Sequence, residues 1–410
     1  MSGTPQITAP SSTDTMRDEP SHSLLVETAD SDGPSHRHPE TLGCWAYCKC
    51  FFFPCIIPLS VLPVLCCCCL RKPLNEKWGK FFEAAVVAAR VGGATLAPRI
   101  WAMRILTDPP IGVVPLWLPI LPDGVAWAEH RQVIDDRPRG EWFFPSSSKG
   151  VCCGRANACK GDDEEQLIQT IASRTRVVLY FHGGAFSVCT PRTHRPILMR
   201  LVHETGATVL ATAYRRAPEH PWPTPVDDCL DTYQWMLECG ARAEQVAFAG
   251  DSAGGGLVVA VMAAARARGL PLPAGGIMIS PWLDLADPMT SPSWQNNQRY
   301  DYLIPSWVRE FALAYAGGRD LREASPGNVP VDGLGPLLIE VGDCEVLRDQ
   351  VVAFVDKARA AGADVTLNVS EAMVHVFPLF AFAAPNHLPP NTAFSNMAAF
   401  LDRILPPSAQ

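Results

Sequence analysis

The chain has 410 residues, of which 34 are Lys or Arg and 42 are Asp or Glu, and its formal net charge is −8. An acidic chain without a basic field is not expected to bind nucleic acid, so this class of function is excluded. Because a single core stops growing at roughly 250–300 residues, the length predicts one large domain with an extension. Eight of the 15 cysteines crowd between residues 44 and 69, a distribution that argues against a disulfide-stapled fold.

The first 72 residues contain two segments of different character. Residues 1–43 are rich in Ser, Thr, Pro and charged side chains, a composition that predicts a disordered tail. Residues 44–72 are Cys-rich and hydrophobic, and their apolar run, residues 51–70, is long enough to cross a bilayer. A polar tail precedes this run and no small-residue cleavage site follows it, so a cleaved signal peptide is not predicted. We interpret residues 44–72 as a membrane-anchor segment.

The mode of anchoring can be interpreted in several ways. Pro54, Pro58 and Pro63 interrupt the apolar run, so a bent or shallow insertion competes with a clean span. The clustered cysteines are candidates for S-palmitoylation, and a Cys-rich packing or metal-binding segment is the alternative. We expect a membrane-associated protein, at the endoplasmic reticulum or another endomembrane, with the side of the membrane and the oligomeric state left open.

Residues 73–125 are predicted to form a helical or irregular cap. Apolar side chains recur there at helical spacing, as one buried helix face requires: Trp78, Phe81, Phe82, Ala85, Val86 and Ala89. A second apolar patch, residues 111–121, contains too many prolines for a regular helix.

A large domain is predicted over residues 126–405. Residues 127–143 are typical of two short strands, and a polar insertion follows at about residues 146–174. Beyond Thr175, helices alternate with short strands, which we predict at residues 177–181, 208–214, 246–249, 276–280, 337–341 and 365–369. This alternation predicts an α/β fold with a mostly parallel sheet that helices cover on both faces.

A G-x-S-x-G motif at residues 250–254 follows one of these strands and precedes a helix. The two glycines allow the tight turn that lifts the hydroxyl of Ser252 clear of the backbone at the start of the helix. Ser252 is therefore a candidate nucleophile. The structural alternative is a Gly-rich turn that only packs.

A second Gly-rich turn, Phe181-His182-Gly183-Gly184-Ala185-Phe186, ends another apolar strand. Acyl transfer builds negative charge on a carbonyl oxygen, and backbone amides of small residues can approach that oxygen closely. These residues are candidates for an oxyanion hole, against the alternative of a plain strand-ending turn.

Acids and a histidine follow the last two predicted strands. Asp343, Glu345 and Asp349 come after the strand at residues 337–341, and His375 comes after the strand at residues 365–369. Ser, acid and His in this chain order, at the carboxyl edge of a parallel sheet, are typical of a hydrolytic triad. A satisfied structural histidine is the alternative for His375.

Six motifs in this order resemble those of the hormone-sensitive-lipase-like group of α/β-hydrolases, namely HGGAF, YRRAPEHPWPTPVDD, GDSAGG, SPWLDL, EVLRD and MVHVF. This group includes bacterial family IV esterases, arylacetamide deacetylase and fungal steryl acetyl hydrolase. The resemblance implies an α/β-hydrolase fold: an eight-stranded, mostly parallel sheet with helices on both faces and a helical N-terminal cap. It also implies hydrolysis of carboxylic esters with no metal or organic cofactor.

The resemblance assigns roles by position. Ser252 is the nucleophile, His375 is the general base and acid, and the oxyanion hole falls on the amides of Gly183, Gly184, Ala185 and Ala253. The group's HGGG is HGGA in this chain, a change that keeps the backbone amide.

The triad acid departs from the group's pattern. D-P-L-x-D is replaced by Glu345-Val346-Leu347-Arg348-Asp349, so the acidic position falls on a glutamate. Glutamate also serves as a triad acid. We rank Glu345 first and keep Asp349 and Asp343 as alternatives.

The expected substrate is a small apolar ester, either lipid-like or a steryl or aryl acetate. The competing class of function is a catalytically inactive hydrolase fold that binds a ligand or serves as a membrane scaffold.

Overall fold

The structure is a computed structural model. It describes residues 125–134, 137–145, 176–383 and 389–405, and, between Asn75 and Arg104, residues 75, 77, 78, 82, 83, 85–87, 89, 90 and 104. The predicted tail (1–43), anchor segment (44–72) and insertion (146–174), and most of the predicted cap (73–125), lie outside the described residues. Among the described residues, no helix combines the length and the apolar character needed to cross a membrane.

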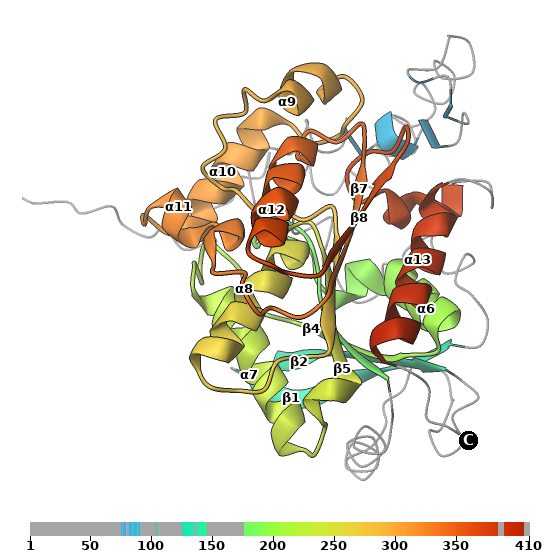
Figure 1. Cartoon of the computed structure of the whole chain (residues 1–410), viewed down its shortest axis with the longest axis vertical. Coiled ribbons are helices and arrows are strands. Elements are labelled where there is room, and N and C mark those ends of the chain that lie inside the picture. Colours follow the sequence, from blue (N-terminus) through green and yellow to red (C-terminus); the bar gives the residue numbers. More distant parts are fainter. Residues whose placement is uncertain are drawn as a thin grey trace, which may run out of the picture. The chain divides into compact units, whose positions relative to one another are not determined.

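An eight-stranded sheet forms the centre of the described chain (Figure 1). Its strands, in chain order, are β1 (Val125–Ile134), β2 (Arg137–Pro145), β3 (Val177–Phe181), β4 (Thr208–Thr212), β5 (Val246–Asp251), β6 (Gly275–Ile279), β7 (Leu337–Gly342) and β8 (Val365–Ser370). Their order across the sheet is β1-β2-β4-β3-β5-β6-β7-β8. The predicted eight strands are confirmed, with ends that differ by one or two residues.

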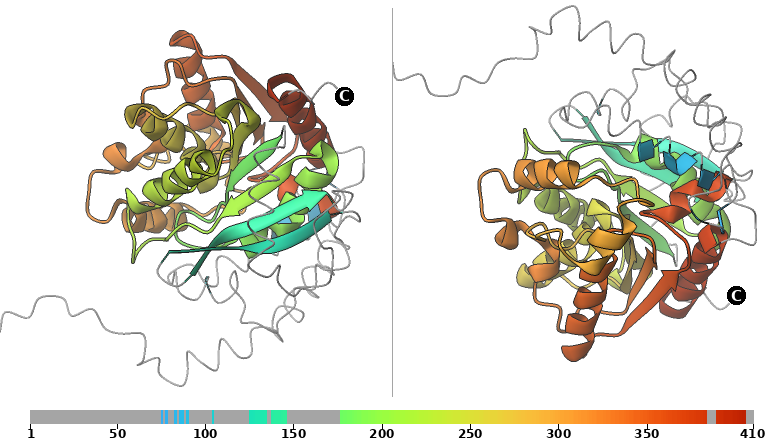
Figure 2. Two further views of the ribbon diagram at one scale, coloured as in Figure 1. Left: turned by 90° about the horizontal axis from the view of Figure 1, so that it is seen from below. Right: turned by 90° about the horizontal axis from the view of Figure 1, so that it is seen from above.

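Only β2 runs against the direction of the other strands. It pairs antiparallel with both β1 and β4, whereas every pairing from β4 to β8 is parallel. Figure 2 shows the β1 and β2 pair, in turquoise, at one edge of the sheet. The mostly parallel sheet is confirmed.

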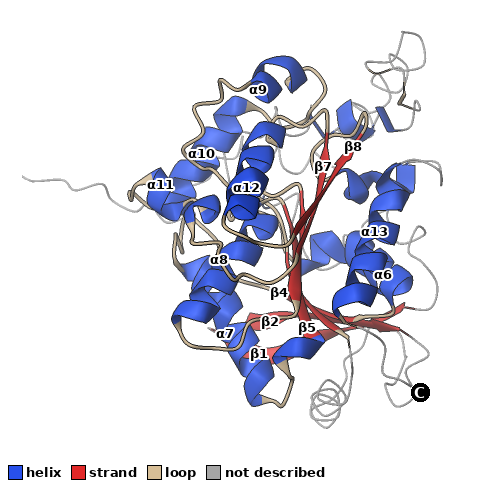
Figure 3. Ribbon diagram, in the orientation of Figure 1, coloured by secondary structure: helices blue, strands red, loops and turns tan. Residues whose placement is uncertain are grey.

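Helices cover both faces of the sheet, as predicted (Figure 3). One face carries α6 (Arg195–Thr205) and α13 (Pro389–Ile404). The other carries α7 (Thr224–Glu238), α8 (Ala253–Ala267), α9 (Pro292–Asn297), α10 (Pro305–Ala316), α11 (Leu321–Ala324) and α12 (Arg348–Ala360). Short 3₁₀ turns complete the chain at η3 (Pro191–His194), η4 (Ala243–Gln245), η5 (Pro326–Asn328) and η6 (Phe377–Ala383).

The alternation of side chains along each strand explains why the sheet is buried on both faces. In β3, Leu179 and Phe181 belong to the hydrophobic cluster under α7 and α8, whereas Val178 and Tyr180 belong to the cluster under α6 and α13. Successive side chains of a strand point to opposite faces, so a central strand with two covered faces must be apolar throughout. The run VVLYF meets that requirement, and all five residues are buried.

The described N-terminal residues pack against the second of these clusters. Residues 82, 83, 85–87, 89 and 90 are helical, and Trp78, Phe82 and Val86 are buried, as the helical spacing predicted. The Phe82 ring lies 5.4 Å from the Trp78 ring and 5.8 Å from the Phe380 ring, measured between centroids. Trp78 also donates a hydrogen bond to the carbonyl of Ala372, three residues before His375.

The parallel strands bring five loops to one edge of the sheet. The loops after β3, β5, β6, β7 and β8 carry Gly183, Ser252, Ser280, Glu345 and His375 respectively. Parallel strands direct their carboxyl ends to the same edge, which is where ligand sites of α/β folds form.

Candidate active site

Ser252 occupies a sharp turn between β5 and α8. Its backbone has φ 53° and ψ −120°, a strained conformation for a residue with a side chain. A Cβ atom at Gly254 would lie 1.9 Å from the carbonyl oxygen of Phe181, so only glycine fits at that position. The turn leaves Ser252 half-buried while its neighbours Asp251 and Ala253 are buried, so its hydroxyl is the part of the turn that a substrate can reach.

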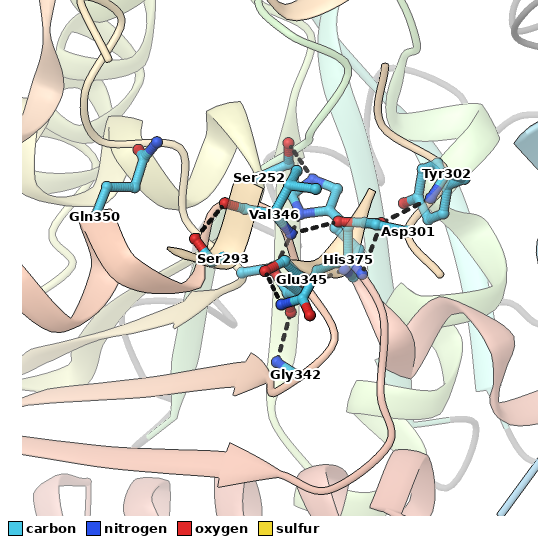
Figure 4. A network of polar contacts seen from close by, with 12 residues as sticks. Ser252, Ser293, Asp301, Tyr302, Gly342, Glu345, Val346, Gln350 and His375 are labelled. Carbon is cyan, nitrogen blue, oxygen red and sulfur yellow. Dashed lines mark hydrogen bonds and ion pairs between the residues drawn. The ribbon is translucent and has the colours of Figure 1, made fainter. Parts of the chain in front are cut away.

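The structure brings Ser252, His375 and Glu345 into one hydrogen-bonded chain (Figure 4). His375 Nε2 lies 2.8 Å from Ser252 Oγ. On the other side of the imidazole, His375 Nδ1 lies 3.2 Å from Glu345 Oε2. Both His375 and Glu345 are fully buried. The geometry allows the imidazole to accept a proton from Ser252 while the carboxylate fixes its orientation and tautomer.

Glu345 raises the basicity of His375. Burial alone lowers the pKa of His375, but the hydrogen bond and the charge of Glu345, with further contributions from Asp301 and Asp251, raise that pKa above its ordinary value of 6.5. The imidazolium is therefore stabilised inside the protein, as a general base requires.

Two further groups hold the Glu345 carboxylate in place. Its Oε1 atom accepts hydrogen bonds from the Ser280 hydroxyl (2.6 Å) and from the Gly342 amide (2.6 Å). The Ser280 oxygen in turn accepts a hydrogen bond from the amide of Val376, the residue after His375 (2.9 Å). Ser280 thus links the acid to the histidine loop.

The two alternative acids have other contacts. Asp349 Oδ2 accepts a hydrogen bond from the Ser293 amide at the start of α9 (2.8 Å), and its Oδ1 pairs with Arg348 (3.0 Å). The Asp343 amide donates to the Ser370 carbonyl (3.0 Å). Among the described hydrogen bonds, neither side chain reaches His375, so of the three acids Glu345 is the one that contacts the imidazole.

The Gly-rich loop after β3 lies against the nucleophile turn. Gly184 has φ 109° and Ala185 has φ 51°, and a Cβ atom at Gly184 would lie 2.2 Å from the carbonyl oxygen of Val188. The amides of Gly184 and Ala185 donate no hydrogen bond to a described residue. Ala253 is the first residue of α8, where an amide has no acceptor in its own helix. These three amides are available to an oxyanion.

The prediction for Gly183 is wrong. Its amide donates a hydrogen bond to Asp251 Oδ1 (2.9 Å), and a buried amide with a carboxylate partner is not free to bind substrate. Gly183 instead attaches the loop to the residue that precedes the nucleophile.

A buried cluster around Asp251 was not predicted from the sequence. Asp251 Oδ1 also accepts a hydrogen bond from the Tyr180 hydroxyl (2.8 Å), and Asp251 Oδ2 lies 3.2 Å from His194 Nε2. Burial opposes both charges, but the pair lowers the pKa of Asp251 and raises the pKa of His194 relative to their ordinary values. His194 carried no sequence signal because its partner is 57 residues away.

Ser280 and Asp301 were also missed. Ser280 opens the SPWLDL motif at the end of β6, so the motif was a usable signal for it. Asp301 lies in a segment without a motif. Among the described residues, no group of three or more His, Cys, Asp or Glu side chains is placed to hold a metal ion.

Known proteins share this fold and this sequence pattern. A protein family described as having the alpha/beta hydrolase fold matches residues 178–379. An acetyl-hydrolase of Streptomyces hygroscopicus is 42% identical over 204 residues, which cover 49% of this chain and 68% of that protein. A carboxylesterase of Mycobacterium tuberculosis is 31% identical over 220 residues, which cover 51% of this chain and 68% of that protein. The crystal structure of an esterase from the bacterial hormone-sensitive lipase family matches with a TM-score of 0.65 at 31% identity, and covers 80% of this chain and 99% of its own.

The chain belongs to the hormone-sensitive-lipase-like group of α/β-hydrolases and is a serine ester hydrolase of the carboxylesterase kind. The predicted family, fold and class of reaction are confirmed.

Proposed function

We propose that this chain hydrolyses small apolar carboxylic esters, with acetates as the preferred class, through an acyl-enzyme on Ser252. The observation that carries the proposal is the hydrogen-bonded chain from Ser252 Oγ to His375 Nε2 (2.8 Å) and from His375 Nδ1 to Glu345 Oε2 (3.2 Å).

The two half-reactions follow from this arrangement. His375 accepts the Ser252 proton as the oxygen attacks the ester carbonyl, and the imidazolium then protonates the leaving alcohol. Water attacks the acyl-enzyme in the second half, with His375 again taking the proton. The amides of Gly184, Ala185 and Ala253 would donate to the oxyanion in both halves. Glu345 would keep His375 in the reactive tautomer through its hydrogen bond to Nδ1.

Two observations support an apolar substrate with a short acyl group. The Tyr302 ring lies 5.8 Å from the His375 imidazole, and the Phe380 ring lies 5.8 Å from the Tyr302 ring, so aromatic side chains lie beside the histidine. The Streptomyces relative is an acetyl-hydrolase.

A hydrolysis assay with p-nitrophenyl acetate, butyrate and palmitate tests the proposal. We expect turnover that falls with acyl length, and we expect Ser252→Ala to lower kcat by roughly 10³-fold or more. Because the pKa of His375 lies above 6.5, the acid limb of kcat/KM should also lie above pH 6.5. Purified protein that binds an apolar ligand without turning over any ester would favour the inactive-scaffold alternative.

The acid has its own pair of variants. Glu345→Gln keeps the shape of the side chain but removes the charge next to His375, and we expect it to lower kcat by about 10³-fold. Asp349→Asn is the matched control, because Asp349 contacts Ser293 and Arg348, and its kcat should stay near that of the unmodified protein. A loss confined to Asp349→Asn would contradict Glu345 as the acid.

A further inference from the structure

Asp301 is a fully buried acid that the proposed mechanism does not use. It lies in the segment between α9 and α10, on neither of the loops that carry Glu345 and His375. A buried carboxylate is costly unless its oxygens have partners, so the contacts of Asp301 indicate what it does.

Both oxygens of Asp301 accept hydrogen bonds from backbone amides. Oδ2 accepts from Val346, the residue after Glu345 (2.9 Å). Oδ1 accepts from His375 itself (3.3 Å) and from Tyr302 (2.8 Å). Figure 4 shows Asp301 between Val346 and His375. One carboxylate therefore joins the loop after β7 to the loop after β8.

We propose that Asp301 is a positioning residue, whose carboxylate ties the Glu345 loop to the His375 loop and whose negative charge stabilises the imidazolium of His375. This inference rests on the proposed function. Two loops that start from separate strands need a fixed spacing for Glu345 Oε2 to reach His375 Nδ1, and a misplacement of about 1 Å at a reacting group can lower a rate about 10²-fold.

The charges around Asp301 fit this role. Burial raises the pKa of Asp301 to about 6, with His375 opposing and Glu345 adding to the rise. Asp301 is therefore ionised above pH 6, the range in which His375 works as a base. The other facing groups are the Tyr302 hydroxyl, the Cys344 thiol and Arg90, whose Nη1 donates to the Asp301 carbonyl (3.2 Å). The pKa of His375 also depends on Glu345 and Asp251, which remain in place when Asp301 is changed.

The test compares Asp301→Asn and Asp301→Glu with the control Asp356→Asn, an exposed acid on α12. In Asp301→Asn the side chain has no charge. Its amide nitrogen, which donates and cannot accept, replaces one of the two oxygens that accept hydrogen bonds from backbone N–H groups. Glu keeps the charge but moves the carboxylate by one methylene. For each variant, kcat and kcat/KM for p-nitrophenyl acetate are measured from pH 5 to pH 9, and the His375 imidazole is titrated by NMR.

We expect Asp301→Asn to lower kcat by about 10- to 100-fold. Removing a negative charge near His375 lowers the pKa of the imidazole, so the acid limb and the NMR titration should move to lower pH by about one unit. Asp301→Glu should lower kcat with the acid limb unmoved, and Asp356→Asn should change neither. A purely structural role would reduce the fraction of active protein without moving the limb.

The outcomes separate this inference from the proposed function. If Asp301→Asn retains the kcat and the acid limb of a protein whose turnover depends on Ser252, the inference is overturned and the proposed function stands. If the unmodified protein hydrolyses no ester, the proposed function fails, and the NMR titration of His375 still decides: an unshifted imidazole in Asp301→Asn overturns the inference. If Asp301→Asn does not fold, Asp301→Glu decides, with the active sites counted by titration. An unchanged kcat per active site overturns the inference. A reduced kcat per active site with an unmoved limb supports it, because a purely structural role would lower only the fraction of active protein.

Discussion

The Asp251 side chain precedes the proposed nucleophile in the sequence and holds the loop that carries two of the proposed oxyanion amides. Asp251 accepts hydrogen bonds from Gly183 and Tyr180 and faces His194, and both members of the Asp251–His194 pair are buried. An unpaired carboxylate at this point would repel the oxyanion of the proposed mechanism, so a protonated His194 would have an electrostatic role as well as a structural one.

Replacing His194 should affect both stability and turnover. His194→Gln leaves Asp251 as a buried charge without a cationic partner, and we expect a loss of about 2–3 kcal/mol in the free energy of unfolding near pH 6 together with a lower kcat. His203→Gln is the matched control, because His203 lies on α6, the helix whose N-cap position His194 occupies, with 51% of its side chain exposed. Urea unfolding and p-nitrophenyl acetate hydrolysis measure the two effects.

The pH dependence of this effect has a defined sign. The pKa of Asp251 is lowered from 3.8, so its contribution is present above pH 3.8 and is lost as the pH falls through the lowered value. The pKa of His194 is raised from 6.5, so its contribution is present below pH 6.5 and is lost as the pH rises through the raised value. The stability difference between His194→Gln and the unmodified protein should shrink in alkaline buffer. A constant difference would contradict the ion pair.

One buried acid, Glu340, joins two neighbouring strands and a helix. Glu340 of β7 accepts hydrogen bonds at Oε1 from Asn368 of β8 (2.7 Å) and from Asn396 of α13 (3.0 Å). Its Oε2 atom has no hydrogen-bond partner among the described residues. Burial raises the pKa of Glu340 to about 7, and the two asparagine bonds only partly oppose that rise.

Glu340 should therefore destabilise the sheet edge in alkaline buffer. Between pH 4.5 and pH 7 the folded protein holds a proton that the unfolded chain releases, so stability falls as the pH rises through this window. We expect Glu340→Gln to be more stable than the unmodified protein by about 1–3 kcal/mol at pH 8, and to show no such gain at pH 4.5. Urea unfolding at both pH values measures the difference.

Glu323→Gln is the control for this prediction, because Glu323 is exposed on α11. Its substitution should change stability little at either pH. An equal loss of stability at pH 4.5 and pH 8 for Glu340→Gln would show that shape, and not charge, dominates at this site.

We propose that residues 44–72 attach the hydrolase to a membrane, at the endoplasmic reticulum or another endomembrane. The apolar run at residues 51–70 and its adjacent cysteines support this proposal. An anchored enzyme would meet apolar esters where they accumulate, in agreement with the substrates proposed above.

Extraction of cell membranes tests the anchor. We expect the full chain to stay in the pellet after carbonate treatment, and a chain lacking residues 44–72 to be released. Release of the full chain only after hydroxylamine would indicate thioester-linked acyl chains, whereas retention after both treatments would indicate insertion. Full-length protein found in the supernatant without treatment would contradict membrane attachment.

The sequence predicted features that depend on local patterns. Strands such as VVLYF are apolar throughout because both faces of a central strand are covered, and the glycines of the Ser252 turn are required by close backbone approach. The motif around His375 follows β8 within a few residues, so the position of His375 at the carboxyl edge of the sheet could also be predicted.

Features that depend on contacts between distant residues could not be predicted from the sequence. Three acids follow β7 within seven residues, and only the folded loops show that Glu345 faces His375 while Asp349 accepts a hydrogen bond from the Ser293 amide. The sequence predicts the Gly183 amide as an oxyanion donor, but in the folded protein this amide donates to Asp251, 68 residues away. Asp301 meets His375 across 74 residues. The family and the fold could be predicted from the sequence because they depend on local pattern, and so could the turn that carries Ser252. The positions of the acid, the oxyanion loop and the buried charges required the tertiary structure, because a hydrogen bond depends on where two side chains meet in space.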